Sequence, residues 1–426
     1  MVKEINISDK KSKKVKNEIP PKEEVKTLDT MAVTEKKKIT LKEFFVKYQS
    51  RIILITAITL VLGIIGFFYF GIYRAKPYQK PTELINLNEE YLVSLKPESS
   101  LSNLPTPSPT EPRTEVSPLN GKLFTKTEIT NLSKNRPVAV MINNHSVARP
   151  QSGLNSADLV YETLVESGIT RYLAIFWSEA PKKVGPIRSA RQYYLEWLSP
   201  YDPLFIYDGC ASSLDPRVNA CGNIYIYNIK NIATIGAWRW NDGRRYAPHN
   251  EYSSILSAWE YAKKVNWDDM SKIDAWKFKK DSTSEERGLK TKVKISFSSK
   301  LSNGGAYDVI WTYDTKSNAY YKQTGGKVDI DQETNTQVYA KSVVIQETSI
   351  VSAYDDKARV IIDTIGEGKA TFLIDGKIIT GTWEKKSRTD RTNYFDKDGN
   401  EIQFNRGRIW ITTISRSVGK FDIIEQ

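Results

Sequence analysis

Cysteine and histidine are scarce in this sequence, which has two of each among its 426 residues. Cys210 and Cys221 are too few for a zinc cluster or for the dense disulfide scaffold of a small secreted protein. The two histidines, His145 and His249, form neither an HxxxH nor an HxH spacing, which would indicate a metal site. We therefore expect no bound metal and no other cofactor.

A concentrated positive charge is also missing, although the formal net charge is +12. Residues 1–51 carry 14 Lys and Arg against 8 Asp and Glu, and the rest of the chain carries 48 against 42. The larger part is therefore only mildly basic, unlike the dense basic surface of a nucleic-acid-binding domain. We expect no nucleic-acid partner.

One stretch has no charged side chain at all. Residues 52–73 read IILITAITLVLGIIGFFYFGIY, and a helix of this length, at about 1.5 Å per residue, spans the roughly 30 Å hydrocarbon core of a bilayer. The stretch is too long and begins too late for a signal peptide, and no small-residue cleavage site follows it. More Lys and Arg precede it than follow it, which predicts a single-pass membrane protein with a cytoplasmic N-terminus and the body outside.

Composition divides the remaining chain into segments. Residues 1–51 are rich in Lys and Glu, which is typical of a disordered tail. Residues 74–135 hold eight of the 18 prolines and are predicted to form an extended stalk outside the membrane. The body then begins near Asn135, and we predict an α/β domain over 136–284 followed by a mostly antiparallel β-rich domain over 285–426.

Local patterns predict the elements of the first domain. Residues 138–142 are a continuous apolar run, which indicates a buried strand. Residues 153–177 hold two apolar runs around Ser167 and Gly168, which favour a hairpin, with a helix over 157–166 as the alternative. The other expected elements are a helix over 187–198, a strand over 203–209 and a helix capped by Asn250. After about residue 285, short runs such as TKVKISFSS and RIWITTI alternate with Gly, Asp and Asn turns.

Several short motifs occur in order along the body. They read RPVAVMINNH, RPQSGL, ADLVYE, VESGITR, GPIRSAR and APHN in the first domain, and YFDKDGNEI and RIWITTI in the second. Together they resemble the YerB-like family, whose members are described as bacterial lipoproteins of unknown function. The resemblance covers roughly residues 135–424 and implies the two-part layout and a place outside the cytoplasm, but no reaction. Such lipoproteins use an acylated N-terminal cysteine, and this chain has none before Cys210, so we expect the segment 52–73 to replace the lipid anchor.

Arginines gather in or beside these motifs. A short loop between the hairpin and the next helix would bring Arg171 close to Arg188, with Arg191 one turn further on. Clustered guanidinium groups repel one another unless an anion neutralises them, and arginine binds phosphate or carboxylate through two parallel hydrogen bonds. Backbone N–H groups at the start of the helix would add donors. The alternative is internal pairing, of Arg171 with Glu162 or Glu166 and of Arg188 with Asp208.

The two histidines lie in polar strings, INNHS and APHNE. With Asn143, Asn144, Asp158 and Asp208 they could form a general-base site or a two-histidine metal site, although a loop histidine that bonds to backbone is the commoner outcome. His249 is expected just before a helix N-cap, which would keep its imidazole neutral. A triad of Ser152, His145 and Asp158 can also be drawn, but the serine lacks a GxSxG elbow.

Two further features add to this picture. The run AWRWNDGRRY over 237–246 interleaves Trp238 and Trp240 with arginines, which suits a sugar ring bearing an acidic group, while core aromatics with arginines at the rim are the alternative. Cys210 and Cys221 enclose a ten-residue loop, and outside the membrane we expect them to form a disulfide.

Three functions remain open at this point. The first is a membrane-anchored extracytoplasmic protein that binds an anionic cell-envelope ligand, such as a phosphorylated or carboxylated glycan or a lipid-linked intermediate. The second is an envelope hydrolase or transferase that uses His145 or His249 as base, and the third is a scaffold for a protein partner. The residues expected to bind the anionic ligand are Arg149, Arg171, Arg188, Arg191, Arg244, Arg245, Asn144, Trp238 and Trp240.

Overall fold

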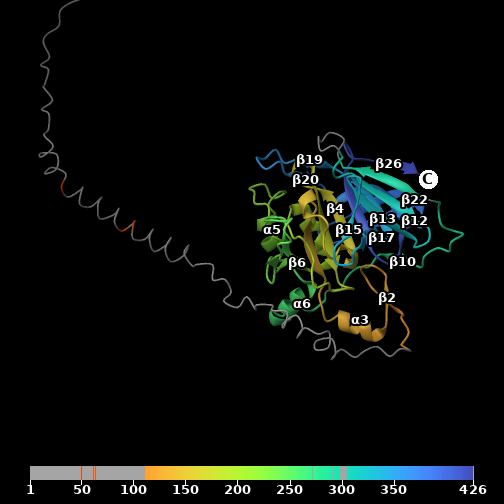
Figure 1. Cartoon of the computed structure of the whole chain (residues 1–426), viewed down its shortest axis with the longest axis horizontal. Coiled ribbons are helices and arrows are strands. Elements are labelled where there is room, and N and C mark those ends of the chain that lie inside the picture. The colour runs from red at the N-terminus through yellow and green to blue at the C-terminus, as the bar shows by residue number, and fades with distance from the viewer. Residues whose placement is uncertain are drawn as a thin grey trace, which may run out of the picture. The chain divides into compact units, whose positions relative to one another are not determined.

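The computed structural model describes residues 111–270, 272–289, 291–297 and 305–425, together with residues 49, 61 and 63. The chain divides into two units, 1–96 and 97–426, and the described ranges of the second unit form the folded body (Figure 1). The predicted tail, transmembrane segment and first part of the stalk lie outside the described residues, apart from those three positions. No helix within the described part of the chain is long and apolar enough to cross a membrane.

A ten-stranded sheet runs through the body. Its strands, in order across the sheet, are β23 (Asn393–Asp396), β22 (Lys377–Lys385), β21 (Gly366–Ile374), β18 (Ser342–Thr348), β25 (Ile409–Ser415), β4 (Leu159–Leu164), β5 (Thr170–Phe176), β3 (Val138–Asn143), β6 (Leu204–Ile206) and β7 (Lys230–Asn231). The strands of the two predicted domains meet where β25 pairs in parallel with β4. Both parts of the chain therefore contribute to one sheet, and the body is mostly β-structure.

The central strands are apolar because both faces of the sheet are covered. In β3, VAVMIN, all six residues are buried. Successive side chains point to opposite faces, so Val138 and Val140 belong to one hydrophobic core and Ala139 and Met141 to the other. Helices α4 (Gln192–Leu198) and α5 (Ala220–Ile226) cover the core that contains Ala139 and Met141. Helix α6 (Ile255–Lys264) covers the core that contains Val138 and Val140.

A second sheet lies on the same face as α6. Its strands, in order, are β14 (Lys327–Val328), β13 (Ala319–Thr324), β12 (Val309–Asp314), β11 (Lys292–Ser296) and β26 (Lys420–Glu425), and β17 (Tyr339–Ala340) also pairs with β13. Alternate residues of β12 are buried, and Trp311 from this strand meets Trp410 of β25 with ring centroids 5.4 Å apart. The body is therefore layered, with helices, the large sheet, and then the smaller sheet with α6.

The predicted hairpin is confirmed, and the alternative helix over 157–166 is wrong. β4 and β5 are antiparallel, with Leu164 opposite Thr170, and the turn Glu166–Gly168 places Ser167 at a φ of 57°. The strands predicted over 138–142 and 203–209 are present as β3 and β6. These elements follow from local sequence patterns, which is why the sequence predicts them well.

The helix predicted over 187–198 is shorter than expected, because α4 begins at Gln192. The preceding residues are extended and bind the edge of the sheet: Ile187 pairs with Ile142, the Arg188 N–H donates to the Met141 carbonyl at 2.9 Å, and the Ala190 N–H donates to the Gly209 carbonyl at 2.9 Å. These strand-like hydrogen bonds replace the ones that a first helical turn would make.

Asn250 is not the cap of the following helix, which corrects a second prediction. Helix α6 begins at Ile255, and Ser254 is its cap, with the Ser254 hydroxyl accepting from the Ser257 N–H at 3.3 Å. The residues directly after Asn250 form the short strand β9 (Glu251–Tyr252), which pairs with β8 (Trp238–Arg239). The helix macrodipole therefore does not act directly beside His249.

The body also begins earlier than the boundary predicted near Asn135. Strands β1 (Glu115–Val116) and β2 (Leu123–Phe124) pair with each other, and α3 (Lys126–Leu132) starts with a capping box of Thr125 and Glu128. Leu119 is fully buried in the core. The remaining short strands are β10 (Lys277–Lys279) with β24 (Gln403–Asn405), β15 (Ile330–Asp331) with β16 (Thr336–Gln337), and β19 (Ile350–Ser352) with β20 (Val360–Ile362).

Candidate functional site

The arginine motif lies at one edge of the large sheet. Strands β3 and β6 are parallel and end at this edge, and β5 begins there, with Arg171 opposite Asn143. The segment that carries Arg188 joins the two strand ends, because its N–H donates to Met141 of β3 and its carbonyl accepts from the Asp208 N–H at 3.2 Å. The carboxyl ends of parallel strands are a common place for ligand sites.

A surface pocket of about 320 Å³ opens between these arginines. Nine residues line it, and five of them are basic: Arg171, Arg188, Arg191, Lys357 and Arg359. Glu166 is the only acidic residue in the lining. Lys357 and Arg359 lie between β19 and β20 and were not predicted from the sequence, because nothing local connects them with the GPIRSAR motif. Arg359 pairs with Asp355 at 3.2 Å and Lys357 with Asp356 at 3.0 Å, and neither carboxylate lines the pocket. The positive charge that remains in this concave surface attracts anions.

Glu166 is shared between two of the arginines. Its carboxylate accepts from Arg191 Nε and lies 3.7 Å from Arg171 Nη2. Burial alone would raise the pKa of Glu166, but the hydrogen bond and charge of Arg191 outweigh burial, so the pKa is lowered. Burial and the neighbouring Arg191 charge lower the pKa of Arg171 to about 10, and Arg171 also donates to the Ser189 carbonyl at 2.6 Å. One carboxylate therefore holds two guanidinium groups in place.

Arg188 has no such partner. Its guanidinium group makes no hydrogen bond or ion pair with any residue that the structure describes, whereas Asp208, its expected partner, lies 3.6 Å from Arg239 instead. Burial lowers the pKa of Arg188, the Asp208 charge opposes this, and the Arg191 charge adds to it. The internal pairing that was the alternative to anion binding therefore occurs at Arg171 and Arg191, and leaves Arg188 open in the pocket.

The structure brings the two histidines together. The rings of His145 and His249 are stacked with centroids 4.5 Å apart, and His249 Nδ1 lies 3.0 Å from Asn143 Nδ2. Burial lowers the pKa of both imidazoles; the charges of Arg149 and Arg188 lower that of His145 further, and those of His145 and Arg188 lower that of His249. Both rings are therefore neutral at neutral pH, and Arg188 is close enough to affect each of them.

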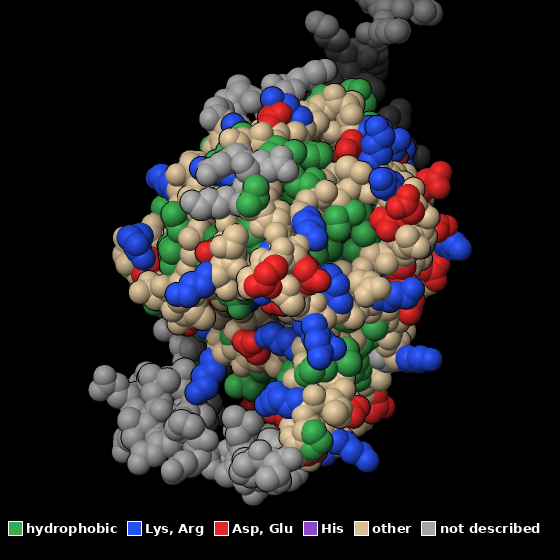
Figure 2. Space-filling view, turned by 90° about the vertical axis from the view of Figure 1, so that its right-hand side faces the viewer, with side chains coloured by type: hydrophobic (Ala, Val, Ile, Leu, Met, Phe, Trp, Pro, Cys, Tyr) green, Lys and Arg blue, Asp and Glu red, His purple; other side chains and the backbone are tan. Residues whose placement is uncertain are grey.

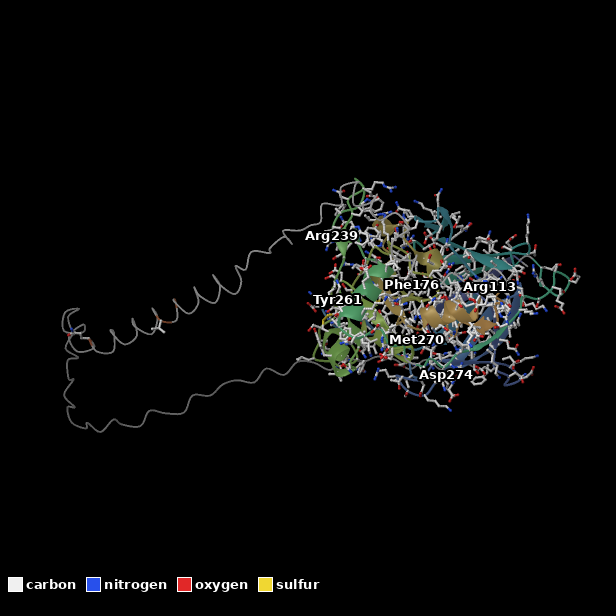
Figure 3. All side chains as sticks on the ribbon, turned by 90° about the horizontal axis from the view of Figure 1, so that it is seen from below. Arg113, Phe176, Arg239, Tyr261, Met270 and Asp274 are labelled. Atoms are coloured by element: carbon white, nitrogen blue, oxygen red, sulfur yellow. A yellow bond between two sulfur atoms is a disulfide. The ribbon has the colours of Figure 1, made fainter. Side chains whose placement is uncertain are left out.

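A pair of carboxyl groups lies in the same region. Glu251 shares a hydrogen bond with Asp208, and Arg239 Nη2 lies 2.7 Å from Glu251 and 3.6 Å from Asp208. Burial, followed by the hydrogen bond and charge of Asp208, raises the pKa of Glu251 to about 7. Arg239 itself lies at the rim of the body (Figure 3). Glu251 was not among the predicted site residues, although it directly follows the APHN motif.

The other arginines predicted to bind a ligand have internal partners. Arg149 Nε donates to the Asn144 side chain at 2.9 Å, and Asn144 is buried and donates to the Thr170 hydroxyl at 2.7 Å. Arg245 is buried and donates to the Tyr252 hydroxyl at 2.7 Å, as well as to Pro150 and Gln332. Arg244 is exposed and pairs with Asp242 at 3.1 Å. None of these arginines lines the pocket at Arg188.

The two tryptophans differ in what they offer to a ligand. Trp238 is exposed. The Lys183 ammonium group lies 3.3 Å from the centroid of the Trp240 ring, and the Trp240 and Tyr252 rings are T-shaped with centroids 5.5 Å apart. The Trp240 ring therefore already makes an internal cation–π contact.

Asp158 lies far from the histidines. It precedes β4 and so sits at the opposite edge of the sheet, where its carboxylate accepts from the N–H groups of Trp177 at 2.6 Å and Ser178 at 2.9 Å. The Ser152 hydroxyl donates to Glu333 at 2.7 Å. The structure therefore brings His145 together with His249, and with neither of its expected triad partners.

Cys210 and Cys221 form a disulfide, with Cα atoms 5.2 Å apart. The backbone of Cys210 also forms an isolated β-bridge with that of Ala190, so the disulfide loop begins beside the segment that carries Arg188 and Arg191. Within the described ranges, no group of three or more His, Cys, Asp or Glu side chains could hold a metal ion.

Comparison with known proteins places this fold in a family. Residues 124–268 match the N-terminal domain, and residues 297–411 the C-terminal domain, of a family described as "protein of unknown function (DUF3048)". The Bacillus subtilis (strain 168) protein named "Putative lipoprotein YerB" is 30% identical over 305 residues, which are 70% of this chain and 85% of that protein. The crystal structure of YerB from Bacillus subtilis matches with a TM-score of 0.61 at 27% identity, covering 72% of this chain and 100% of that chain.

This chain belongs to the DUF3048 family. The resemblance to YerB-like proteins that the ordered motifs indicate is thereby confirmed. The family description names no ligand and no reaction, so the function has to be argued from the site itself.

Proposed function

We propose that this protein binds an anionic cell-envelope ligand, a phosphorylated or carboxylated glycan or a lipid-linked intermediate, at the pocket around Arg188. The observation that carries the proposal is that the Arg188 guanidinium group makes no hydrogen bond or ion pair with a described residue, in a pocket lined by five basic residues and one acidic residue. Glu166 is already used by Arg171 and Arg191. A phosphate or carboxylate that accepts two hydrogen bonds from Arg188 would supply the anionic partner that its guanidinium group lacks within the protein.

The proposed location is outside the cytoplasmic membrane, with the chain anchored through residues 52–73. The uncharged run and the bias of Lys and Arg toward its N-terminal side support this topology. The name of the Bacillus subtilis relative, a lipoprotein, agrees with a body held at a membrane surface. A disulfide between Cys210 and Cys221 fits an oxidising compartment.

The test is a binding measurement on the full-length chain in detergent. The probes are polyglycerol phosphate and polygalacturonate, one polymer for each acidic group, at ionic strengths from about 0.02 to 0.5 M. We expect saturable binding at low salt that weakens as salt rises, and a loss of about tenfold or more for Arg188→Ala, since a charge-assisted hydrogen bond contributes about 1.5–3 kcal/mol. Arg113→Ala is the matched control, because Arg113 is an exposed arginine outside the pocket whose partners, Glu128 and the Leu123 carbonyl, also lie outside it. The proposal fails if neither polymer binds at low salt or if Arg188→Ala binds as well as the unmodified chain.

A second candidate is an envelope hydrolase or transferase, and the stacked histidines favour it. A neutral imidazole can accept a proton, and His145 or His249 would do so close to Arg188, whose charge would stabilise a developing anion. The test is incubation of the protein with the same two polymers, followed by analysis for shortened chains. Cleavage that is lost in both His145→Asn and His249→Asn would support this candidate, and intact polymers would contradict it.

The scaffold alternative has less support on the face that Figure 2 shows. There, Lys and Arg side chains alternate with Asp and Glu, and apolar side chains lie between them. A surface with this mixture is typical of a solvated face.

A further inference from the structure

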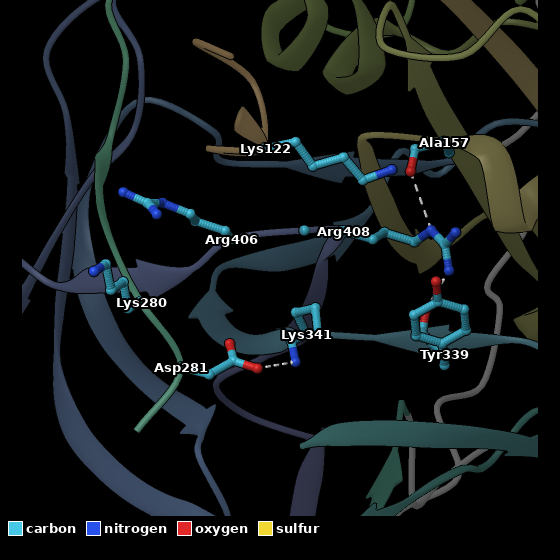
Figure 4. Close-up of a pocket in the computed structure, with 9 residues that line it drawn as sticks. Lys122, Ala157, Lys280, Asp281, Tyr339, Lys341, Arg406 and Arg408 are labelled. Carbon is cyan, nitrogen blue, oxygen red and sulfur yellow. Dashed lines mark hydrogen bonds and ion pairs between the residues drawn. The ribbon is translucent and has the colours of Figure 1, made fainter. Parts of the chain in front are cut away.

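A second basic pocket, of about 420 Å³, lies at the opposite edge of the large sheet (Figure 4). Strands β4, β18 and β25 run parallel to one another and begin at this edge. Ala157, Lys341 and Arg408 precede them and line the pocket. The six residues of β4 separate this edge from the Arg188 pocket, which is about 20 Å at roughly 3.3 Å per residue.

The lining of this second pocket is strongly basic. Its basic residues are Lys122, Lys280, Lys341, Arg406 and Arg408, and Asp281 is its only acidic residue. Asp281 pairs with Lys341 at 2.5 Å. Lys122 pairs at 2.8 Å with Glu179, which does not line the pocket. The positive charge of the pocket is therefore only partly balanced from within the protein.

Arg408 is fully used in holding the walls together. It is buried, and its guanidinium group donates to the Ala157 carbonyl at 3.0 Å and to the Tyr339 carbonyl at 2.5 Å. The same group also donates to Asn155. Arg408 therefore joins the start of β4 to β17, and its role in the pocket is structural.

Arg406 and Lys280 have no such role. Neither side chain makes a hydrogen bond or ion pair with any residue in the described ranges, and Arg406 Nε is buried without an acceptor. A buried donor that lacks an acceptor costs free energy. In Figure 4 the guanidinium group of Arg406 points away from Arg408, toward the side of the pocket where Lys280 lies.

The backbone between the two arginines keeps them apart. Gly407 has a φ of +127°, which other residues rarely adopt, and a Cβ at this position would lie 2.5 Å from Lys341 Cγ. The glycine therefore lets the chain turn between Arg406 and Arg408 while the Lys341 stem packs against it.

We propose that this second pocket binds a phosphate group, with Arg406 and Lys280 as its direct ligands and Lys341 and Lys122 adding positive charge. A guanidinium and an ammonium group that approach from different elements suit a tetrahedral group with several acceptor oxygens and more than one negative charge. The site shares no residue with the Arg188 pocket. It would allow one molecule to hold two anionic groups at opposite edges of the sheet.

The experiment uses the full-length chain in detergent with Arg188→Ala, which disables the first pocket. Inorganic phosphate, pyrophosphate and malonate are titrated separately at low ionic strength by calorimetry. We expect phosphate or pyrophosphate to bind, malonate to bind at least about tenfold more weakly, and Arg406→Gln or Lys280→Gln to weaken phosphate binding about tenfold or more. Arg406→Lys is expected to restore part of the loss, and Arg113→Gln to change nothing.

Three results would overturn the assignment: no phosphate or pyrophosphate binding to the Arg188→Ala chain, equal binding in Arg406→Gln, or malonate binding as tightly as phosphate. Misfolding is not expected to obscure the outcome, because neither Arg406 nor Lys280 gives up an internal bond when it is replaced. Melting temperatures of the variants check this. Because the Arg188 pocket is disabled throughout, failure of the proposed function does not affect this test.

Discussion

His145 and His249 stack against each other with ring centroids 4.5 Å apart, although they come from the first and last of the motifs in the predicted first domain. Two charged imidazoles in this position would repel each other, and Arg188 adds a further positive charge. The stack therefore stays neutral over the physiological range and is held in place partly by Asn143. The pKa values of the two histidines therefore depend on the charge of Arg188.

The first prediction concerns the titration of these histidines. In the unmodified chain both imidazole pKa values lie below the ordinary value of 6.5. Arg188→Ala should raise both, because a nearby positive charge that disfavours the imidazolium form is removed; they should remain below 6.5, because burial is the larger cause. The measurement is an NMR titration of the imidazole C–H signals, which is simple because the chain has only two histidines. Unchanged pKa values in Arg188→Ala, or equal changes in Arg113→Ala, would contradict the geometry of the site.

The second prediction concerns stability and pH at Glu251. Its pKa is about 7 in the folded protein against an ordinary value of 4.5, so the folded state binds more protons than the unfolded state between these values. The stabilisation is therefore present at low pH and is lost as the pH rises through about 7. Glu251→Gln keeps a hydrogen-bond donor for Asp208 and cannot ionise, so the variant should not lose this stabilisation as the pH rises.

The measurement for Glu251 is urea unfolding at several pH values between 5 and 8. The histidines contribute with the opposite sign, since lowered pKa values cost stability as the pH falls below 6.5, but they do so equally in both proteins. The difference between the two proteins isolates Glu251. Glu179→Gln, an exposed glutamate, is the control. The prediction would be contradicted if the free energy of unfolding changed with pH in the same way in the unmodified chain and in Glu251→Gln.

The third prediction concerns Glu166, the acidic residue of the first pocket. Glu166→Gln leaves Arg171 and Arg191 without their carboxylate, so anion affinity should rise while the protein becomes less stable by about 1–3 kcal/mol. Arg188→Ala should do the reverse, losing affinity with little change in stability. Polymer binding and urea unfolding, measured on both variants, test the contrast. A fall in affinity in Glu166→Gln would show that this carboxylate, rather than a ligand, organises the pocket.

The fourth prediction concerns a buried network of ion pairs between the second sheet and the large sheet. Lys322 of β13 lies 2.9 Å from Asp329 and 3.5 Å from Glu162 of β4, and the Lys322 and Glu162 side chains are fully buried. Lys322→Met would leave two buried carboxylates without a cation, so the free energy of unfolding should fall by about 3–5 kcal/mol. Urea unfolding measures this, and Lys377→Met, at an exposed position, is the control. Adding Glu162→Gln and Asp329→Asn to Lys322→Met should recover part of the loss, and no recovery would argue against a charge effect.

The elements that sequence patterns predicted correctly are those with local causes. The hairpin around Ser167 follows from two apolar runs and a turn, and β3 follows from a continuous apolar run. The helix predicted over 187–198 is present, but it begins at Gln192, because the residues before it hydrogen-bond to Met141 and Gly209, which local periodicity cannot indicate. The prediction that Asn250 caps the next helix was also wrong because of a non-local contact, since β9 pairs with β8 before that helix begins.

The candidate site was predicted in its residue types but not in its arrangement. Arg171, Arg188 and Arg191 do line one pocket, whereas Arg149 and Arg245 have internal partners. Lys357 and Arg359 reach the pocket from a distant part of the chain, so no local motif could include them.

The sequence by itself determined the family, the places of most strands and the set of arginines and histidines from which a site could be built. Motifs and apolar periodicity carry that information along a few neighbouring residues. Only the tertiary structure decided that β4 and β25 join both parts of the chain in one sheet, that His145 meets His249, and that two arginines share Glu166 while Arg188 makes no ion pair in the described part of the chain. These outcomes depend on the register and packing of segments far apart in the chain, and no local pattern encodes which charge will meet which.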